Sequence, residues 1–321
     1  MPVNTKAIKT RIKSVGNTKK ITKAMEMVAA AKMRKAVESA LQTRTYASLA
    51  WDLLVKLSVG QKKKLPLLAV RPVEKLLVVL ITSNRGLCGS FNANIIRKIS
   101  AELTDPRNIS VQRVKNGAIM PSEHVVIDVV GVGKKGADFA KKTGYTLVAS
   151  YSEFSDTPSL ADILPISRIV IDAYEKKQYD KVVVAYTDYK SPISQVAKLR
   201  QVLPISEHDL EKMLITLGGE LRAEIARQDD EPSVEIDEYV FEPDTTSVLR
   251  MILPRLVESQ MYQSILESSA SEHSARMMAM RNASDAAGEM IDELTLTFNK
   301  ARQAAITQEI AEIAGGAAAL G

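Results

Sequence analysis

The sequence predicts an α/β protein in which a long helix at each end of the chain pairs with the other as an antiparallel coiled coil, with a small Rossmann-like α/β domain between them. Three observations predict this fold. Residues 4–57 contain no proline, and residues 245–321 contain only Pro254. In both segments, apolar and small residues recur every three or four positions. Between them, continuous apolar runs alternate with helical patterns.

The first long helix is expected within residues 1–60. Its repeating positions follow the three-four spacing of a helix supercoiled against another helix. At 1.5 Å per residue, such a helix reaches about 80 Å. The repeating positions are Ile8, Ile12, Val15, Thr18, Thr22, Met25, Ala29, Met33, Ala36, Ala40, Thr43, Ala47, Ala50, Leu54 and Leu57.

The central α/β domain is expected over residues 73–205, after a boundary at "QKKKLPLLAVRP" (61–72). "EKLLVVLITS" predicts a buried strand, and "NRGLCG" and a helical stretch to Leu103 follow it. The same order recurs in "HVVIDVVGVGKKGADFAKKTG". A helical stretch over 160–177 then leads to the strand "DKVVVAYTDY". Strand, turn and helix in repetition favour a layered α/β domain.

Residues 206–244 are expected to form a linker with a short inserted helix, to which we assign no function. The second long helix is expected over residues 245–321, with a reach of about 105 Å. Pro254 either kinks this helix or marks its effective start. Its repeating positions are Ile252, Leu256, Ser259, Gln263, Leu266, Ala270, His273, Met277, Met280, Ser284, Ala287, Ile291, Leu294, Phe298, Ala301, Ala305, Gln308 and Glu312.

The two helices are expected to pack on each other. Many of their repeating positions are Ala, Ser or Thr, so neither helix is stable alone. An antiparallel pair that leaves and re-enters the central domain is the simplest arrangement. An inert coiled-coil spacer remains an alternative from the pattern alone.

Charge and composition limit the function classes. Residues 1–35 carry ten Lys and Arg against one acid, Glu26, a local net charge of +9 that suits an acidic partner. Nucleic acid is an alternative partner, but the first aromatic residue, Tyr46, lies beyond this segment. No apolar run approaches the ~20 residues of a membrane span. The first residues lack the apolar core of a secretory signal, and a bacterial cytoplasmic protein is expected.

No catalytic group of residues is apparent, and no cofactor or metal site is expected. The single cysteine, Cys88, excludes an internal disulfide and is expected to be a small buried thiol. "GLCG" and "GVGKKG" lack the spacing of phosphate-binding loops and are expected to be strand-to-helix turns. His273 is expected to be packed in the core. An α/β nucleotide-binding enzyme stays open as an alternative.

Four segments resemble the γ subunit of bacterial F-type ATP synthase. They are "RIKSVGNTKKITKAMEMVAAAKMRKA" (11–36), "NRGLCGSFN" (84–92), "SEHSARMMAMRNAS" (271–284) and "NKARQAAITQEIAEIAGGAAAL" (299–320). The resemblance implies a non-catalytic rotor shaft that couples proton-driven rotation to ATP synthesis or hydrolysis at β subunits. Implied partners are three α and three β subunits, the ε subunit and the c-ring, with no nucleic acid. The implied location is the cytoplasmic face of the bacterial plasma membrane, which the chain contacts only through the c-ring.

The resemblance also implies the residues that couple rotation to the β subunits. Met25 falls where the first helix meets a β loop, and Arg276 on the facing helix. Arg302, Gln303 and Thr307 match polar contacts to a β loop. Arg85 and Cys88 fall on a turn that faces the β lever.

Two segments depart from the resemblance. The pattern around 285–288 is less well kept, which leaves the contacts there open. The stretch 207–232 is longer than expected for this family.

The resemblance also implies a role for the end of the second helix. The tip at 315–321, which consists of small residues and has no charged side chain, is implied to turn in an apolar sleeve.

Overall fold

The computed structural model describes residues 5–58, 65–114, 117–152, 158–205 and 244–320. The chain divides into two compact units. The helical unit comprises residues 1–31 and 276–321, and the sheet unit comprises residues 32–275. The predicted linker at 206–244, except Asp244, and the extension at 207–232 lie outside the described residues.

Both predicted long helices are present. Helix α1 runs Thr5–Ser58 and helix α7 runs Thr245–Leu320, and each contributes residues to both units. Pro254 lies inside α7, nine residues after its start. The alternative that Pro254 marks the start of the helix is therefore wrong.

In the helical unit, the repeating positions of α1 form its covered face. Ile8, Ile12 and Val15 are half-buried, and Ala29 is buried. Thr18 is exposed, so its prediction was wrong; its hydroxyl donates to the Ser14 carbonyl oxygen within the helix at 3.2 Å. The spacing therefore predicts the covered face with one exception in this segment.

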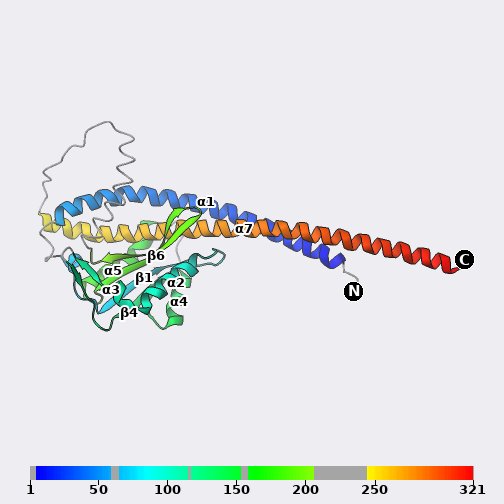
Figure 1. The fold of residues 1–321 in the computed structure, drawn as a ribbon. Helices are drawn as coiled ribbons and strands as arrows, with labels where there is room; N and C mark the ends of the chain where they lie inside the picture. The colour runs from blue at the N-terminus through cyan, green and yellow to red at the C-terminus, as the bar shows by residue number, and fades with distance from the viewer. Residues whose placement is uncertain (1–4, 59–64, 115–116, 153–157, 206–243, 321) are drawn as a thin grey trace, which may run out of the picture. The chain divides into compact units, whose positions relative to one another are not determined.

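The segments of α1 and α7 in the helical unit run antiparallel and side by side (Figure 1). Ser284 and Ala287 of α7 are buried, and a side chain at Gly288 would come within 2.8 Å of the Lys19 ammonium. Small residues thus allow the two helices to approach closely. The segment 285–288, whose contacts the sequence left open, is part of this packing.

A five-stranded sheet forms the middle of the sheet unit, in the order β5-β4-β1-β6-β7. Strands β1, β4, β5 and β6 are parallel, and β7 is antiparallel to β6. The strands run Lys75–Ile81 (β1), Val126–Val132 (β4), Thr146–Tyr151 (β5), Lys181–Ser191 (β6) and Ser194–Leu203 (β7). Only Lys75 of β1 is exposed, as expected for a central strand with both faces covered.

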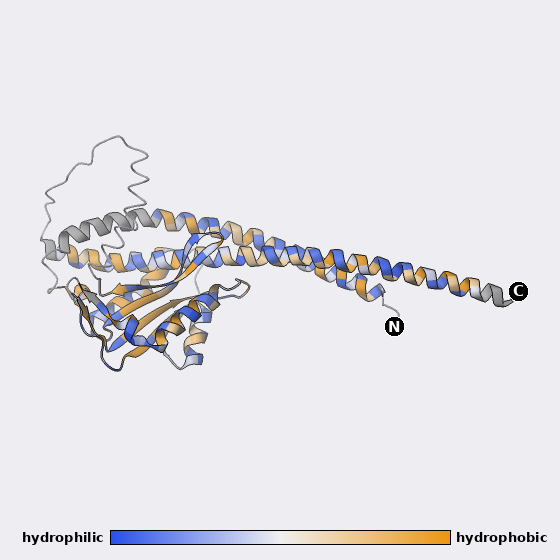
Figure 2. Ribbon diagram, in the orientation of Figure 1, coloured by the Kyte–Doolittle hydropathy of each residue, from blue (hydrophilic) through white to orange (hydrophobic). Residues whose placement is uncertain are grey.

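Helices cover both faces of the sheet. Leu76, Val78 and Leu80 of β1 pack in a cluster with Ile95 and Ile99 of α2 (Phe91–Thr104), and Ala140 of α4 (Lys134–Thr143) joins it. On the other face, Leu77, Val79 and Ile81 pack with α5 (Leu160–Glu175) and with Leu253 and Leu256 of α7. Figure 2 shows the apolar strands of the sheet. The first part of α7 is therefore part of the core of the α/β domain.

Several short elements were not predicted. They are the 3-10 helix η1 (Pro66–Leu68), helix α3 (Pro106–Ser110), the hairpin of β2 (Gln112–Val114) with β3 (Gly117–Ile119), and strands β5 and β7. Strands β5 and β7 lie at the two edges of the sheet. Edge strands are partly exposed and carry weaker apolar runs than β1, which explains why the sequence pattern missed them.

An ion pair fastens the beginnings of β1 and β6. Arg71 Nε lies 2.5 Å from Asp180 Oδ1, and both side chains are mostly buried. Asp180 Oδ2 accepts hydrogen bonds from the backbone N–H groups of Glu74 and Lys75, each at 3.0 Å. The Arg71 guanidinium also lies 4.5 Å from the centre of the Tyr174 ring. The carboxylate of Asp180 therefore connects two chain segments more than 100 residues apart.

Stability of the sheet unit should decrease in acid through Asp180. Burial alone would raise the pKa of Asp180, but hydrogen bonds from Arg71, Lys75 and Glu74 outweigh it and lower the pKa below its ordinary value. The stabilisation is complete above the ordinary pKa of about 3.9 and is lost as pH falls through the lower folded-state pKa. Asp180→Asn should lower the free energy of unfolding at pH 6 by about 2 kcal/mol.

Urea unfolding of both chains between pH 6 and pH 2.5 checks this. The difference between the native chain and Asp180→Asn should shrink as pH falls. A difference that stays constant with pH would contradict a charge-dependent role for Asp180. Glu102→Gln, which removes an exposed i,i+4 pair with Lys98, serves as the control and should have little effect at any pH.

Candidate functional site

Five of the coupling residues implied by the resemblance lie in two groups on the helical unit. Met25 on α1 and Arg276 on α7 are both half-buried, whereas Arg302, Gln303 and Thr307 are exposed. Arg276 and Arg302 are separated along α7 by about 39 Å at 1.5 Å per residue. The structure therefore keeps Arg276 apart from Arg302, Gln303 and Thr307 along α7 and does not bring these residues into one pocket.

The last part of α7 is uncovered within the described chain. Every residue of 302–315 is exposed, and α7 extends past the start of α1 (Figure 1). The prediction that Ala305, Gln308 and Glu312 lie on a covered face is wrong, because α1 begins at Thr5 and no other described element packs there. Burial of the repeating positions ends at Ala301, which is half-buried.

A stripe of isoleucines runs along this uncovered segment. Ile306, Ile310 and Ile313 are 48%, 61% and 74% exposed. Their spacing of four and three places them on one face of the helix. Large aliphatic side chains in a row on a single exposed helix mark a surface for another protein. These residues were not predicted from the sequence, although their spacing of four and three was a usable signal.

The turn after β1 exposes Arg85 and buries Cys88. Cys88 is 2% exposed, and its thiol lies 3.2 Å from Asn92 Nδ2 and 3.7 Å from Ser83 Oγ. The prediction of a buried thiol is confirmed. Leu87, which was not predicted to have a role, is 63% exposed and has a φ of 63°. A positive φ at a non-glycine residue often marks a functional turn.

The beginning of α4 has no free backbone donors for a phosphate. The N–H groups of Lys134, Lys135 and Gly136 donate to Asn84 Oδ1 at 3.0 Å, Ser83 O at 3.3 Å and Thr82 Oγ1 at 2.7 Å. Phosphate-binding loops require such N–H groups to point at the ligand. The interpretation of "GVGKKG" as a strand-to-helix turn is therefore confirmed.

The isolated chain should bind no ATP with micromolar affinity and should hydrolyse none. The physical reason is that the three backbone N–H groups at the beginning of α4 already donate hydrogen bonds to residues 82–84, just after β1. Isothermal titration calorimetry with Mg-ATP measures this directly, with a nucleotide-binding β subunit as the positive control. Saturable micromolar binding by the purified chain would contradict the prediction.

Cys88→Ser should leave turnover of the assembled complex within about threefold. A hydroxyl is close to a thiol in size, and Ser83, Asn92 and the Arg85 carbonyl offer hydrogen-bond partners within 3.9 Å of the sulfur. ATPase assays of the reconstituted complex provide the measurement. A hundredfold loss would show that the thiol has a chemical role.

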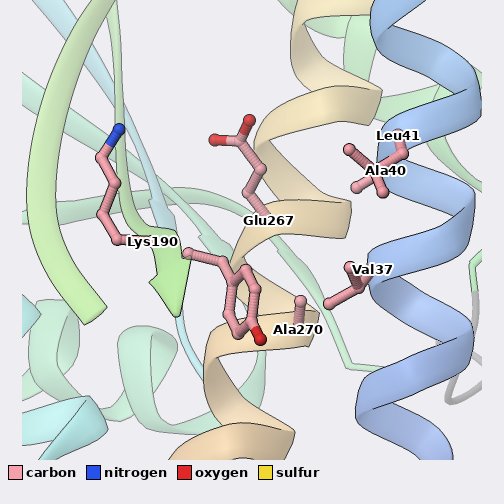
Figure 3. A pocket seen from close by; sticks show the side chains of 7 residues that line it. Val37, Ala40, Leu41, Lys190, Glu267 and Ala270 are labelled. Atoms are coloured by element: carbon pink, nitrogen blue, oxygen red, sulfur yellow. The ribbon is translucent and has the colours of Figure 1, made fainter. Parts of the chain in front are cut away.

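A cavity of about 140 Å³ lies where α1, strand β6 and α7 meet in the sheet unit. Figure 3 shows Val37, Ala40 and Leu41 on α1 opposite Glu267 and Ala270 on α7, with Lys190 on the strand. Glu267 is buried and accepts a hydrogen bond from Gln263 at 2.8 Å. The ionisable side chains of this lining are Glu267, Lys190 and Tyr189, and it contains no histidine, cysteine or serine.

A buried carboxylate fixes the strand beside this cavity. Asp188 is 4% exposed and pairs with Lys190 at 3.2 Å and with Lys198. Burial alone would raise the pKa of Asp188, but the two lysines outweigh it and lower the pKa below its ordinary value. Lys190 and Lys198 are thus both paired with a carboxylate inside the β6–β7 hairpin.

Serines of α7 attach this helix to the same hairpin. Ser271 Oγ donates to the Thr187 carbonyl at 3.0 Å, and Ser274 Oγ donates to the Pro192 carbonyl at 2.7 Å. His273, between them, is 5% exposed, which confirms the prediction of a packed histidine. These contacts position the helix against the hairpin.

The part of the chain that the structure describes has neither a metal-binding cluster nor a membrane-spanning helix. No group of three or more His, Cys, Asp and Glu side chains there could hold a metal ion. None of the described helices is both long and apolar enough to cross a membrane.

Comparison with known proteins identifies the class to which this fold belongs. A family model described as ATP synthase matches residues 4–320. The ATP synthase gamma chain of Herpetosiphon aurantiacus is 42% identical over 98% of this chain and 97% of its own length. The gamma chain of Roseiflexus castenholzii is 40% identical over 99% of this chain and 98% of its own length. The chain belongs to the ATP synthase gamma chain family.

Solved structures agree with this fold. A chain from the central stalk and c-ring structure of Tetrahymena thermophila mitochondrial ATP synthase is 26% identical, with a TM-score of 0.57, covering 82% of this chain and 99% of that one. A chain from the Euglena gracilis mitochondrial ATP synthase structure of OSCP, F1 and c-ring has a TM-score of 0.61 at 20% identity, covering 98% and 94%. At 20% identity, the Euglena gracilis structure shows similarity of fold alone.

Proposed function

We propose that this chain is the rotor shaft of a bacterial F-type ATP synthase and couples proton-driven rotation to ATP synthesis or hydrolysis. The observation that carries the proposal is the uncovered end of α7, where Ile306, Ile310 and Ile313 form an exposed apolar stripe. A single helix with such a stripe needs a surrounding partner. Its membership of the gamma chain family supports a ring of ATP synthase subunits as that partner.

The chain acts without catalysing a reaction itself. The absence of free phosphate donors at α4 supports a mechanical role over the alternative of a nucleotide-binding enzyme. Its proposed partners are three α and three β subunits around the helices, together with the ε subunit and the c-ring. It is peripheral at the cytoplasmic face of the plasma membrane and contacts the membrane only through the c-ring.

Within this function, the proposed contacts to the β subunits are made in three places. Met25 and Arg276 act where the two helices are paired. Arg302, Gln303 and Thr307 act on the uncovered part of α7. Arg85 acts on the turn after β1, where it is exposed, and Cys88 supports that turn from beneath because its side chain is buried.

Reconstitution tests the proposal. The purified chain is mixed with α and β subunits from the same source, and ATPase activity and composition are measured. The expected result is a complex with one copy of this chain per three β subunits, and ATPase activity that appears only on mixing. Activity of the α and β subunits that does not change on adding the chain would overturn the proposal.

A further inference from the structure

The cavity where α1, β6 and α7 meet combines an apolar wall with a buried carboxylate. The carboxylate belongs to Glu267, and Figure 3 shows this side chain extending from α7 on the side of the strand that carries Lys190. The apolar wall consists of aliphatic side chains of α1 and α7, which are Val37, Ala40, Leu41 and Ala270. A site of this kind suits a ligand with one polar end and one apolar end.

The side chains of α7 beside the cavity offer more hydrogen-bond acceptors than donors. Gln263, which is buried, donates its amide N–H to Glu267 Oε1 at 2.8 Å. The amide oxygen of Gln263 is also buried and accepts no hydrogen bond within the part of the chain that the structure describes. A carboxylate can accept about four hydrogen bonds, so the bond from Gln263 leaves Glu267 able to accept from further donors. A ligand that donates hydrogen bonds therefore fits this end of the cavity.

The charges of the lining favour a cation over an anion. Lys190 is exposed, and its ammonium group lies 3.2 Å from Asp188 Oδ2. Glu267 is buried, and buried charges are screened less than exposed ones, so its carboxylate dominates the field within the cavity. Tyr189, which is half-buried in the same lining, adds an aromatic ring, and ring faces attract ammonium groups. Ca²⁺ or Mg²⁺ is less suited, because these ions take about six or more oxygen ligands.

The size of the cavity limits the ligand to a small molecule. Its volume is about 140 Å³. An apolar cavity of about 150 Å³ accepts benzene. We propose that this cavity binds a small primary ammonium compound whose compact aliphatic body is about the size of benzene. The ammonium group donates to Glu267, and the aliphatic body packs against Ala40 and Ala270. This site is additional to the rotor function and does not depend on it.

Methyl NMR of the full-length chain tests the site, with cyclopentylamine as the probe. At neutral pH this amine is protonated, and it should shift the methyl signals of Ala40 and Ala270 until they saturate, with a Kd in the millimolar range. Cyclopentanol has the same ring without the charge. It should bind at least about tenfold more weakly, because hydrogen bonds between ionised groups are stronger than neutral ones.

Two variants test the polar end and the apolar wall separately. Glu267→Gln keeps an acceptor for Gln263 but removes the charge, and it should weaken cyclopentylamine binding at least about tenfold. Ala270→Val fills part of the cavity and should abolish the shift of the Ala40 methyl signal. The matched control, Glu258→Gln, removes another buried carboxylate of α7, which pairs with Arg255 at 2.9 Å, and should leave binding within about twofold. Unchanged methyl signals elsewhere show that each variant is folded.

Three results would overturn the proposal. The absence of a saturable shift with cyclopentylamine would show that the cavity holds only water. Equal binding of cyclopentanol would show an apolar pocket that does not select a cation, and this comparison needs no variant to fold. Binding that survives Glu267→Gln would place the amine elsewhere. Because the experiment uses the chain without α and β subunits, none of these results bears on the rotor function.

Discussion

Replacing Gly133 with alanine should destabilise the α/β domain by more than about 4 kcal/mol, an exceptional cost for a single methyl group. Gly133 joins β4 to α4 with a φ of 91°, a conformation that L-residues rarely adopt. An added Cβ would lie 2.1 Å from the Thr82 carbonyl oxygen and 2.7 Å from its carbon. No side-chain rotation can relieve a clash with backbone.

The surroundings of Gly133 leave little room for adjustment. Its N–H donates to the Tyr151 carbonyl at 2.7 Å, and Thr82 N donates to the Val132 carbonyl at 2.8 Å. Moving Gly133 away from Thr82 would break bonds that join β1, β4 and β5. It would also disturb the Thr82 hydroxyl, which accepts from Gly136 N.

Two other glycines serve as matched controls. Gly144 has a φ of 81° but open space around its Cα, so Gly144→Ala should cost only about 1–2 kcal/mol. Gly16 lies inside α1 with open space, so Gly16→Ala should stabilise the helix by about 0.5–1 kcal/mol. Urea titration with hydrogen exchange of the β1 and β4 amides measures all three. Equal effects for Gly133 and Gly144 would contradict the clash.

This region shows what the sequence could and could not predict. The run 76–81 predicted a central buried strand because both of its faces are apolar. The segment "GVGKKG" favoured a strand-to-helix turn over a phosphate loop, because Lys134 is not followed by Ser or Thr, but the roles of Gly133 and Gly136 depend on contacts with Thr82, more than 50 residues earlier. Spacing along the chain cannot reveal such a contact.

In the two long helices, by contrast, the sequence predicted more packing than the structure shows. Apart from Thr18, the three-four spacing predicted the covered positions of α1 from Ile8 to Ala40 and of α7 from Ile252 to Ala301. The same spacing continues through Ala305, Gln308 and Glu312, where the partner helix has ended. A three-four repeat indicates that one face of a helix can pack against another helix. The length of the partner helix decides how far along the repeat this packing extends. Arg302, Gln303 and Thr307 were predicted only through the resemblance, because a polar residue on an exposed helix carries no local signal.

Those three residues lie at the start of the uncovered segment of α7, and the second large effect is expected there. Arg302→Ala with Thr307→Ala should slow ATPase turnover of the reconstituted complex about tenfold or more. An arginine that is desolvated on assembly leaves its partner unpaired when it is removed, and such a loss typically costs 2–5 kcal/mol. Each 1.36 kcal/mol on the barrier corresponds to a tenfold change in rate.

A matched pair on the same helix provides the control. Lys300 and Thr295 are also a cation and a threonine five residues apart, and both are exposed. Thr295 and Thr307 each donate to the carbonyl four residues earlier, at 2.7 and 3.0 Å. The variant Thr295→Ala with Lys300→Ala therefore removes one exposed cation and one threonine hydroxyl that bonds within the helix, as the test variant does, and it should leave turnover within twofold.

Deletion of residues 315–321 should have a much smaller effect than the double substitution. This tip carries no charge, and small apolar contacts stabilise only in proportion to their area, at about 25 cal/mol per Å². The shortened chain keeps Ile306, Ile310 and Ile313, so assembly of the complex should be retained and its turnover should stay within about threefold. If the deletion abolishes activity while the double substitution has no effect, the prediction is wrong: residues 315–321 then make the contact that turnover requires, and Arg302 and Thr307 do not.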